Sequence, residues 1–207
     1  MKCLYCDSNY YKHSILSALI EKDKLCTACR KELKINKKVI EVNDLKVKTY
    51  FDYDSIFKSI LLQYKECYDE ALSEVFLYEL KNYLRIRYFD YHIIYVPSSK
   101  RKLDQRGFNH LEKMFACLNL KEAKGLRQIN DYCQQDKNII DRKKMLNNYI
   151  YEGNRYKKVL LVDDVLTSGA SIYGSYKAIQ DHFDKIECLV LGIVQKNEGN
   201  AFKLINK

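Results

Sequence analysis

The chain has 207 residues, a formal net charge of +9 and 47% hydrophobic residues, among them 18 tyrosines and 8 phenylalanines. This composition excludes a disordered chain, and no apolar run approaches the ~18 residues that a membrane span requires. The first residues lack the apolar core of a signal peptide, so we expect a cytoplasmic protein. The length fits one substantial domain with a small appendage, and the positive charge fits a polyanionic partner.

Two C-x-x-C pairs, Cys3/Cys6 and Cys26/Cys29, stand at the beginning of the chain. Their spacing predicts a four-cysteine site for Zn²⁺, as in zinc ribbons. Four thiolates complete a tetrahedron, so the metal would be structural and would supply the folding energy of residues 1–35. Four incidental cysteines or a redox C-x-x-C pair are the alternatives. The remaining cysteines are expected to be ordinary, partly buried residues: Cys67, Cys117, Cys133 and Cys188.

After the cysteines the sequence predicts alternating strands and helices. Period-two alternation indicates a half-buried strand, wholly apolar runs indicate buried parallel strands, and an Asp-Ser pair marks a helix start. The predicted strands cover 45–53, 91–96, 159–162 and 186–194, and the predicted helices begin at 54 and cover 68–88 and 170–182. Such alternation is typical of an α/β fold, an open parallel sheet flanked by helices. We assign residues 36–207 to this domain, with a hood-like region over about 36–90.

The strongest chemical signal is V-L-L-V-D-D-V-L-T-S-G-A-S over residues 159–171. Asp163 and Asp164 are expected at the carboxyl end of a buried strand, where open α/β sheets bind ligands. The next turn offers hydroxyls and backbone N–H groups to a phosphate, through Thr167, Ser168, Gly169, Ala170 and Ser171. Two carboxylates beside a phosphate site predict a phosphorylated sugar whose hydroxyls they accept, with Mg²⁺ screening the charge. An ordinary strand followed by a glycine turn is the alternative.

A second polar segment begins at Pro97, directly after the predicted strand over 91–96. It contains hydroxyl and cationic side chains, among them Ser98, Ser99, Lys100 and Arg106. Such groups suit a multiply charged pyrophosphate. A solvated basic loop and a contact to a nucleic-acid backbone are the alternatives.

The window over 159–171 resembles the signature of type I phosphoribosyltransferases, which bind phosphoribosyl pyrophosphate. The resemblance implies that Asp163 and Asp164 bind the ribose hydroxyls and that the turn over 167–171 binds the 5′-phosphate. It also implies that the segment after residue 97 contacts the pyrophosphate and that Mg²⁺ accompanies the ligand. In an active enzyme a nitrogen would displace pyrophosphate from ribose C1.

Combined with the four-cysteine beginning, this window is similar to the ComF family of competence proteins. The similarity runs from Cys3 to about Val194 and includes L-Q-Y-K at 62–65, R-G-F-N at 106–109 and the weaker pair Gln135 and Arg142. One departure is Tyr68-Asp69, where the family often has Gly-Asp.

The resemblance implies a role in the uptake of transforming DNA, with a ComFA-like helicase as a partner. We expect a competence factor that binds phosphoribosyl pyrophosphate and DNA, single-stranded DNA above all. The basic clusters over 100–106 and 142–144 and the side chains of Tyr149, Tyr151 and Tyr156 would then contact nucleic acid. An active phosphoribosyltransferase with an unidentified nitrogenous acceptor is the alternative, and a structural adaptor docked through its zinc ribbon is a third possibility.

Overall fold

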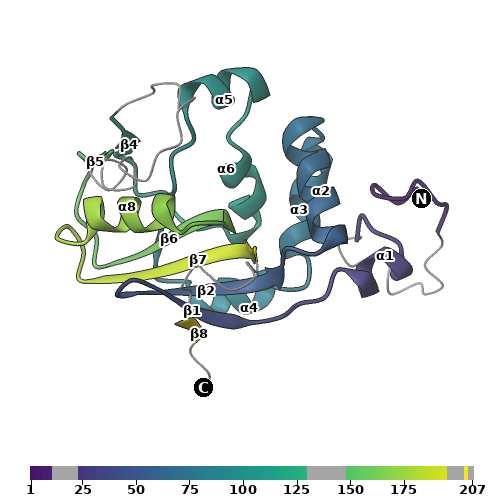
Figure 1. Ribbon diagram of the computed structural model, residues 1–207, viewed down its shortest axis with the longest axis horizontal. Coiled ribbons are helices and arrows are strands. Elements are labelled where there is room, and N and C mark those ends of the chain that lie inside the picture. Colours follow the sequence, from purple (N-terminus) through teal and green to yellow (C-terminus); the bar gives the residue numbers. More distant parts are fainter. Residues whose placement is uncertain (11–22, 130–147, 195–202, 205–207) are drawn as a thin grey trace.

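The computed structural model describes residues 1–10, 23–129, 148–194 and 203–204 and shows a mixed α/β fold (Figure 1). Its main sheet has six strands in the order β3-β6-β7-β2-β1-β8. These strands are β1 (Lys38–Val42), β2 (Leu45–Asp52), β3 (His92–Tyr95), β6 (Lys158–Leu166), β7 (Lys185–Ile193) and β8 (Lys203–Leu204). A separate antiparallel pair consists of β4 (Leu126–Gln128) and β5 (Tyr149–Tyr151).

The helices surround this sheet. They are α1 (Thr27–Glu32), α2 (Ser55–Glu66), α3 (Ser73–Leu77), α4 (Lys81–Arg87), α5 (Lys100–Arg106), α6 (His110–Phe115) and α8 (Ala170–Ile179), with short 3-10 turns η2 (Glu70–Leu72) and η3 (Ala116–Leu118). None of the helices in the described parts of the chain has the length and apolarity to cross a membrane.

The mostly parallel sheet confirms the predicted fold class. β3, β6, β7 and β2 run parallel to one another, whereas β1 pairs with β2 as an antiparallel hairpin that the sequence did not predict. The hairpin turns at Asn43, whose φ of 56° lies in the left-handed region that asparagine tolerates in tight turns. Strands β1 and β2 fall within the stretch assigned to a hood-like region, and both belong to the main sheet.

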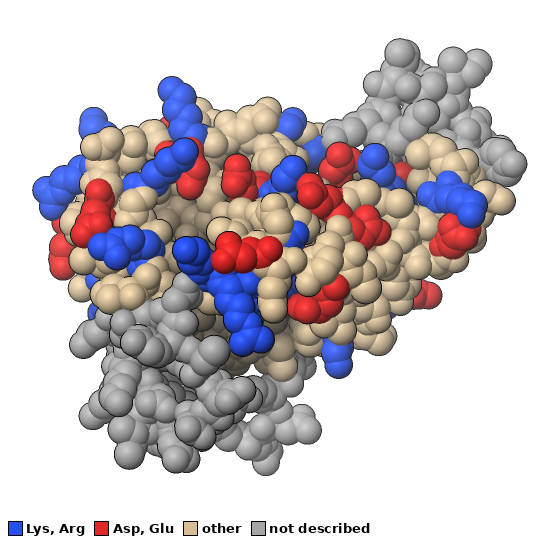
Figure 2. Space-filling model, turned by 90° about the horizontal axis from the view of Figure 1, so that it is seen from above, with Lys and Arg blue, Asp and Glu red and all other residues tan. Residues whose placement is uncertain are grey.

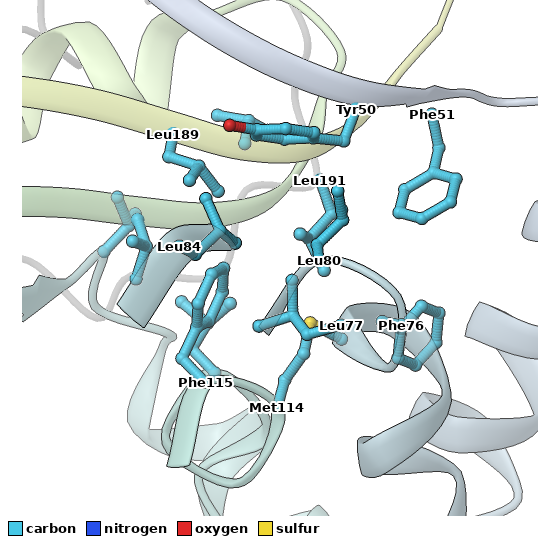
Figure 3. Packing of buried hydrophobic residues seen from close by; sticks show 14 of the residues in the cluster. Tyr50, Phe51, Phe76, Leu77, Leu80, Leu84, Met114, Phe115, Leu189 and Leu191 are labelled. Carbon is cyan, nitrogen blue, oxygen red and sulfur yellow. The ribbon is translucent and has the colours of Figure 1, made fainter. Parts of the chain in front are cut away.

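Helices cover both faces of the central strands. The side chains of four consecutive β6 residues, 159–162, are all fully buried, which requires cover on both sides of the strand. In Figure 3, Leu84 on α4 and Phe115 on α6 pack below β7 and β2, near Leu189 and Tyr50. Helix α8 crosses in front of the sheet in Figure 1.

The single helix predicted over 68–88 is wrong, because the segment consists of η2, α3 and α4. Tyr68 has a φ of 59°, which separates η2 from the helix α2 before it. Asp69 caps η2 by accepting the N–H of Ala71 at 3.2 Å. The N–H of Leu80 bonds to Leu77 only three residues back, which separates α3 from α4. The positive φ of Tyr68 is a conformation that glycine adopts without cost and that other residues rarely adopt.

Helix α2 lies against the end of β7 because residue 192 has no side chain. A Cβ placed on Gly192 would come within 2.4 Å of Cε1 of Phe57. Phe57 is fully buried and stacks on Phe51 with ring centroids 5.2 Å apart. This close packing holds α2 beside the carboxyl ends of the parallel strands.

A half-buried carboxylate on β7 is surrounded by donors from two other elements. Glu187 accepts hydroxyl hydrogen bonds from Tyr91 at 3.0 Å and Tyr88 at 3.1 Å, and it forms an ion pair with Lys48 of β2. Burial alone would raise its pKa, but Lys48 and the tyrosine hydroxyl outweigh that effect and lower the pKa of Glu187 to about 2. The carboxylate therefore joins β2, β7 and the segment before β3.

Candidate functional site

A cavity of about 750 Å³ opens at the carboxyl ends of β3 and β6. Its walls come from α2, α5, α6 and the beginning of α8, so it lies where open α/β sheets bind ligands. The structure brings most of the predicted site residues together there, namely Ser98, Ser99, Arg106, Asp163, Asp164, Thr167 and Ser171. Lys100, Ser168, Gly169 and Ala170 do not line it.

The two predicted carboxylates lie inside β6, which continues to Leu166, rather than after its end. Side chains of neighbouring strand residues point to opposite faces of a sheet. Asp163 is in register with Val190 of β7 and is partly exposed, whereas Asp164 points toward α2 and α6 and is buried. The two side chains thus lie in different environments.

Asp164 is held by Lys65 and His110, which were not among the predicted site residues. Its Oδ2 forms an ion pair with Lys65 of α2 and a hydrogen bond with Nε2 of His110 on α6. Nδ1 of His110 lies 2.9 Å from Nη1 of Arg106, and Nε of Arg106 donates to the carbonyl of Lys65 at 3.2 Å. Burial raises the pKa of Asp164, but Lys65 and His110 outweigh it and hold the pKa well below its usual range.

Asp163 has the opposite electrostatic character. Its Oδ1 accepts the backbone N–H of Asp164 at 2.9 Å, the one hydrogen bond to its side chain among the described residues. Burial and the neighbouring charge of Asp164 raise the pKa of Asp163. The pair therefore combines a fixed anion with a carboxyl group that holds its proton more tightly.

The predicted phosphate turn connects β6 to α8. Gly169 is the N-cap of α8 with a φ of 75°, a left-handed conformation that glycine adopts without strain. Ser168 Oγ accepts the N–H of Ala170 at 3.4 Å, while Thr167 and Ser171 are exposed and line the cavity. The N-terminus of this ten-residue helix thus begins at the cavity wall.

The R-G-F-N segment has a structural role at every position. Residues 100–106 form α5 rather than a loop, and Gly107 ends that helix with a φ of 76°. The ring of Phe108 packs 5.7 Å from that of Tyr64 on α2, and the Asn109 side chain caps α6. The hydroxyl of Tyr64 donates to the carbonyl of His110 at 2.6 Å. These contacts bring Arg106 and His110 to the cavity beside α2.

The four N-terminal cysteines also come together. Their sulfur atoms all lie within 4.8 Å of one another, and Sγ of Cys6 is 3.8 Å from Sγ of Cys26. That separation matches the edge of a tetrahedron with Zn–S bonds of about 2.3 Å, so the four side chains fit a zinc ion. The N–H of Cys26 also points to Sγ of Cys3 at 3.3 Å.

The single cysteines lie elsewhere. Cys67 is exposed, Cys117 is half-buried and Cys188 is buried. Cys133 lies outside the described residues, as do Gln135, Arg142 and the basic cluster over 142–144.

The cysteine element packs beside α2 and α3 at one end of the molecule (Figure 1). Arg30 on α1 binds both carboxylate oxygens of Asp23 at 2.7 Å and donates to the carbonyl of Val75 at 3.0 Å. Gln63 on α2 donates to the carbonyl of Leu4 at 3.1 Å. Helix α2 therefore contacts the cysteine element through Gln63 and the cavity through Lys65.

Two known proteins are similar to this chain. "Competence protein ComFC" of Streptococcus pneumoniae (strain ATCC BAA-255 / R6) is 29% identical over 133 residues, which cover 63% of this chain and 60% of that protein. "Competence protein ComFC" of Bacillus subtilis (strain 168) is 23% identical over 206 residues, which cover 83% of this chain and 85% of that protein. The chain is ComFC-like. No protein-family profile matches it.

The residues of this ComFC-like chain that were expected to contact nucleic acid do not form one surface among the described residues. On the face shown in Figure 2, lysines and arginines alternate with aspartates and glutamates and do not gather into one basic patch. Tyr149 lines the cavity, Tyr151 is buried with its hydroxyl bonded to the carbonyl of Asn154, and Tyr156 stacks on His92 with centroids 3.9 Å apart. Two of the three tyrosines expected to stack on bases are thus engaged within the fold.

Proposed function

We propose that the cavity binds phosphoribosyl pyrophosphate with Mg²⁺ and that the protein acts in DNA uptake during natural transformation. One observation supports the ligand above all: the β6 carboxylates, the hydroxyls of the turn before α8 and the polar segment after β3 line one cavity. Its volume falls within the range of small-molecule sites.

Each part of the proposed ligand has a matching chemical group. The carboxylates of β6 accept ribose hydroxyls, and Thr167 and Ser171 bind the 5′-phosphate at the positive end of α8. Ser98, Ser99 and the α5 cations bind the pyrophosphate, with Mg²⁺ neutralising part of its charge. The charged phosphate groups at both ends of the ligand are therefore bound by hydrogen-bond donors. The hydroxyls of the uncharged ribose ring are bound by the carboxylate acceptors.

The biological part of the proposal rests on the two similar proteins, whose names state a role in competence. We favour a binding role over turnover, because the sequence has no motif that would bind an acceptor base. A phosphoribosyltransferase acting on a nitrogenous acceptor is the second candidate. DNA, single-stranded above all, and a ComFA-like helicase are the proposed partners. The four cysteines hold a structural Zn²⁺ in this proposal.

Calorimetry with the full chain tests the ligand. Wild-type protein is expected to bind phosphoribosyl pyrophosphate in Mg²⁺ and to lose at least about tenfold in affinity on Asp163→Asn, because one ribose acceptor becomes an amide. Asp104→Asn, on α5 and outside the cavity lining, is the matched control for loss of one negative charge. Equal affinity of wild type and Asp163→Asn would contradict the ribose assignment.

Fluorescence anisotropy with a labelled oligonucleotide tests the DNA partner. Because phosphate contacts release counterions, the affinity for single-stranded DNA is expected to fall at least about tenfold between 50 and 200 mM salt. The double variant Arg101→Gln with Lys102→Gln tests whether the cations at the cavity wall contribute. Affinity that does not change with salt would rule out the electrostatic part of the proposal.

A further inference from the structure

We infer that the two carboxylates of β6 have different roles, and that His110 is a positioning residue that fixes Asp164 while Asp163 is left to rearrange around the ligand. This inference rests on the proposed phosphoribosyl pyrophosphate site. It concerns how the cavity is arranged before the ligand binds. The sequence motif alone does not distinguish the two acids.

The strand geometry gives the first argument. Asp163 and Asp164 are consecutive residues within β6, so their side chains leave the strand toward opposite faces. The Asp164 side chain is 9% exposed and is held from α2 and α6. Asp163 has no ion pair among the described residues, so its carboxyl group is the more adjustable of the two.

The contacts of His110 determine its protonation. An arginine has only donors, so Nη1 of Arg106, 2.9 Å away, requires Nδ1 of His110 to be the acceptor. The imidazole is then neutral and carries its proton on Nε2, from which it donates to Oδ2 of Asp164. Lys65 binds the same oxygen. The carboxylate is thereby oriented through one atom, and among the described residues Oδ1 accepts no hydrogen bond.

The same network offsets the negative charge of the pair. Lys65 and Arg106 contribute two positive charges, His110 is neutral and Asp164 contributes one negative charge. An anionic ligand therefore approaches a site that is not net negative even when Asp163 is ionised. This balance accounts for two neighbouring acids beside a proposed phosphate site.

Two variants separate the positioning role from space filling. His110→Phe keeps an aromatic ring in the buried site but removes both hydrogen bonds. His110→Gln keeps a donor in reach of Asp164. Calorimetry in Mg²⁺ is expected to give about tenfold weaker binding of phosphoribosyl pyrophosphate for His110→Phe, and binding within about threefold of wild type for His110→Gln. In the Asp164→Asn background, His110→Phe is expected to add less than twofold, because the two residues act through one contact.

A measurement without ligand tests the network directly. The chain has four histidines, so the ¹⁵N signals of His110 can be assigned by their loss in His110→Gln. A neutral ring protonated at Nε2 is expected at pH 7. A ring protonated on Nδ1 would overturn the inference. Where thermal melting shows that His110→Phe does not fold, Lys65→Gln removes the other partner of Asp164 and is expected to weaken binding to a similar degree.

The outcomes also separate this inference from the proposed function. Wild-type protein that fails to bind phosphoribosyl pyrophosphate would overturn both. Wild-type binding with unchanged affinity in His110→Phe would overturn the inference and leave the proposed function standing. Equal losses in the Phe and Gln variants would show that a hydrogen-bond donor to Asp164 does not restore binding, which also overturns the inference.

Discussion

The cysteine element and the sheet domain are held together by different means. In the sheet domain, fully buried side chains such as Leu160, Val162 and Leu191 supply the stability. In the N-terminal element, four sulfur atoms lie within 4.8 Å of one another, beside the buried side chains of Leu25 and Leu33. We therefore expect metal-dependent folding at one end of the chain and an ordinary apolar core in the rest.

Removing the metal is expected to have the largest effect and to act on one region only. Cys26→Ser, or a chelator with the wild type, should release the zinc and abolish protection of residues 1–10 and 23–35 against hydrogen exchange. Zinc binding to such sites is worth on the order of 10 kcal/mol, which this small element cannot replace. Elemental analysis and exchange mass spectrometry measure both effects.

The matched control is Cys67→Ser, because Cys67 is exposed and lies outside the cluster. It should leave zinc content and exchange unchanged. If Cys26→Ser retained one zinc per chain, or if β6 and β7 lost protection together with the cysteine element, the contrast between the two regions would be wrong.

A smaller effect is expected at Glu187 and should appear in the sheet domain alone. The pKa of Glu187 is lowered to about 2, so its carboxylate stabilises the folded state above the unfolded pKa of about 4.3. That contribution is lost as the pH falls from about 4.3 toward 2. After allowance for screening by solvent, Glu187→Gln should cost about 1–2 kcal/mol at pH 7 and less at pH 3.

Urea denaturation of wild type and variant at pH 7 and pH 3 measures this difference. Glu70→Gln is the control, since Glu70 forms an exposed ion pair with Lys113 and should change stability little. A Glu187→Gln cost that stays the same at both pH values would remove the electrostatic explanation.

Much of the sheet was predictable because its signals are local. The apolar runs before Pro97 and Asp163 and the turn at Gly169 each predicted an element that the structure contains. The helix over 68–88 was predicted wrongly because its apolar residues keep helical spacing across the breaks. The break inside this segment separates α3 from α4 over residues 78–80, where the sequence has neither glycine nor proline to indicate it.

The site was predictable only in part for a related reason. The residues of the β6 motif are neighbours in sequence, so one window reveals them. Lys65 and His110 reach Asp164 from α2 and α6, and only the fold brings these segments together. The L-Q-Y-K and R-G-F-N segments were part of the resemblance. The sequence did not indicate that the two segments lie next to each other in the fold.

Three consecutive residues of α2 perform three separate tasks. Gln63 binds the cysteine element, Tyr64 holds the carbonyl of His110, and Lys65 binds Asp164. Relatives that lack the four cysteines are therefore expected to vary at the first of these positions while keeping the other two. Position 63 is thus expected to change together with the cysteines, and positions 64 and 65 together with the cavity.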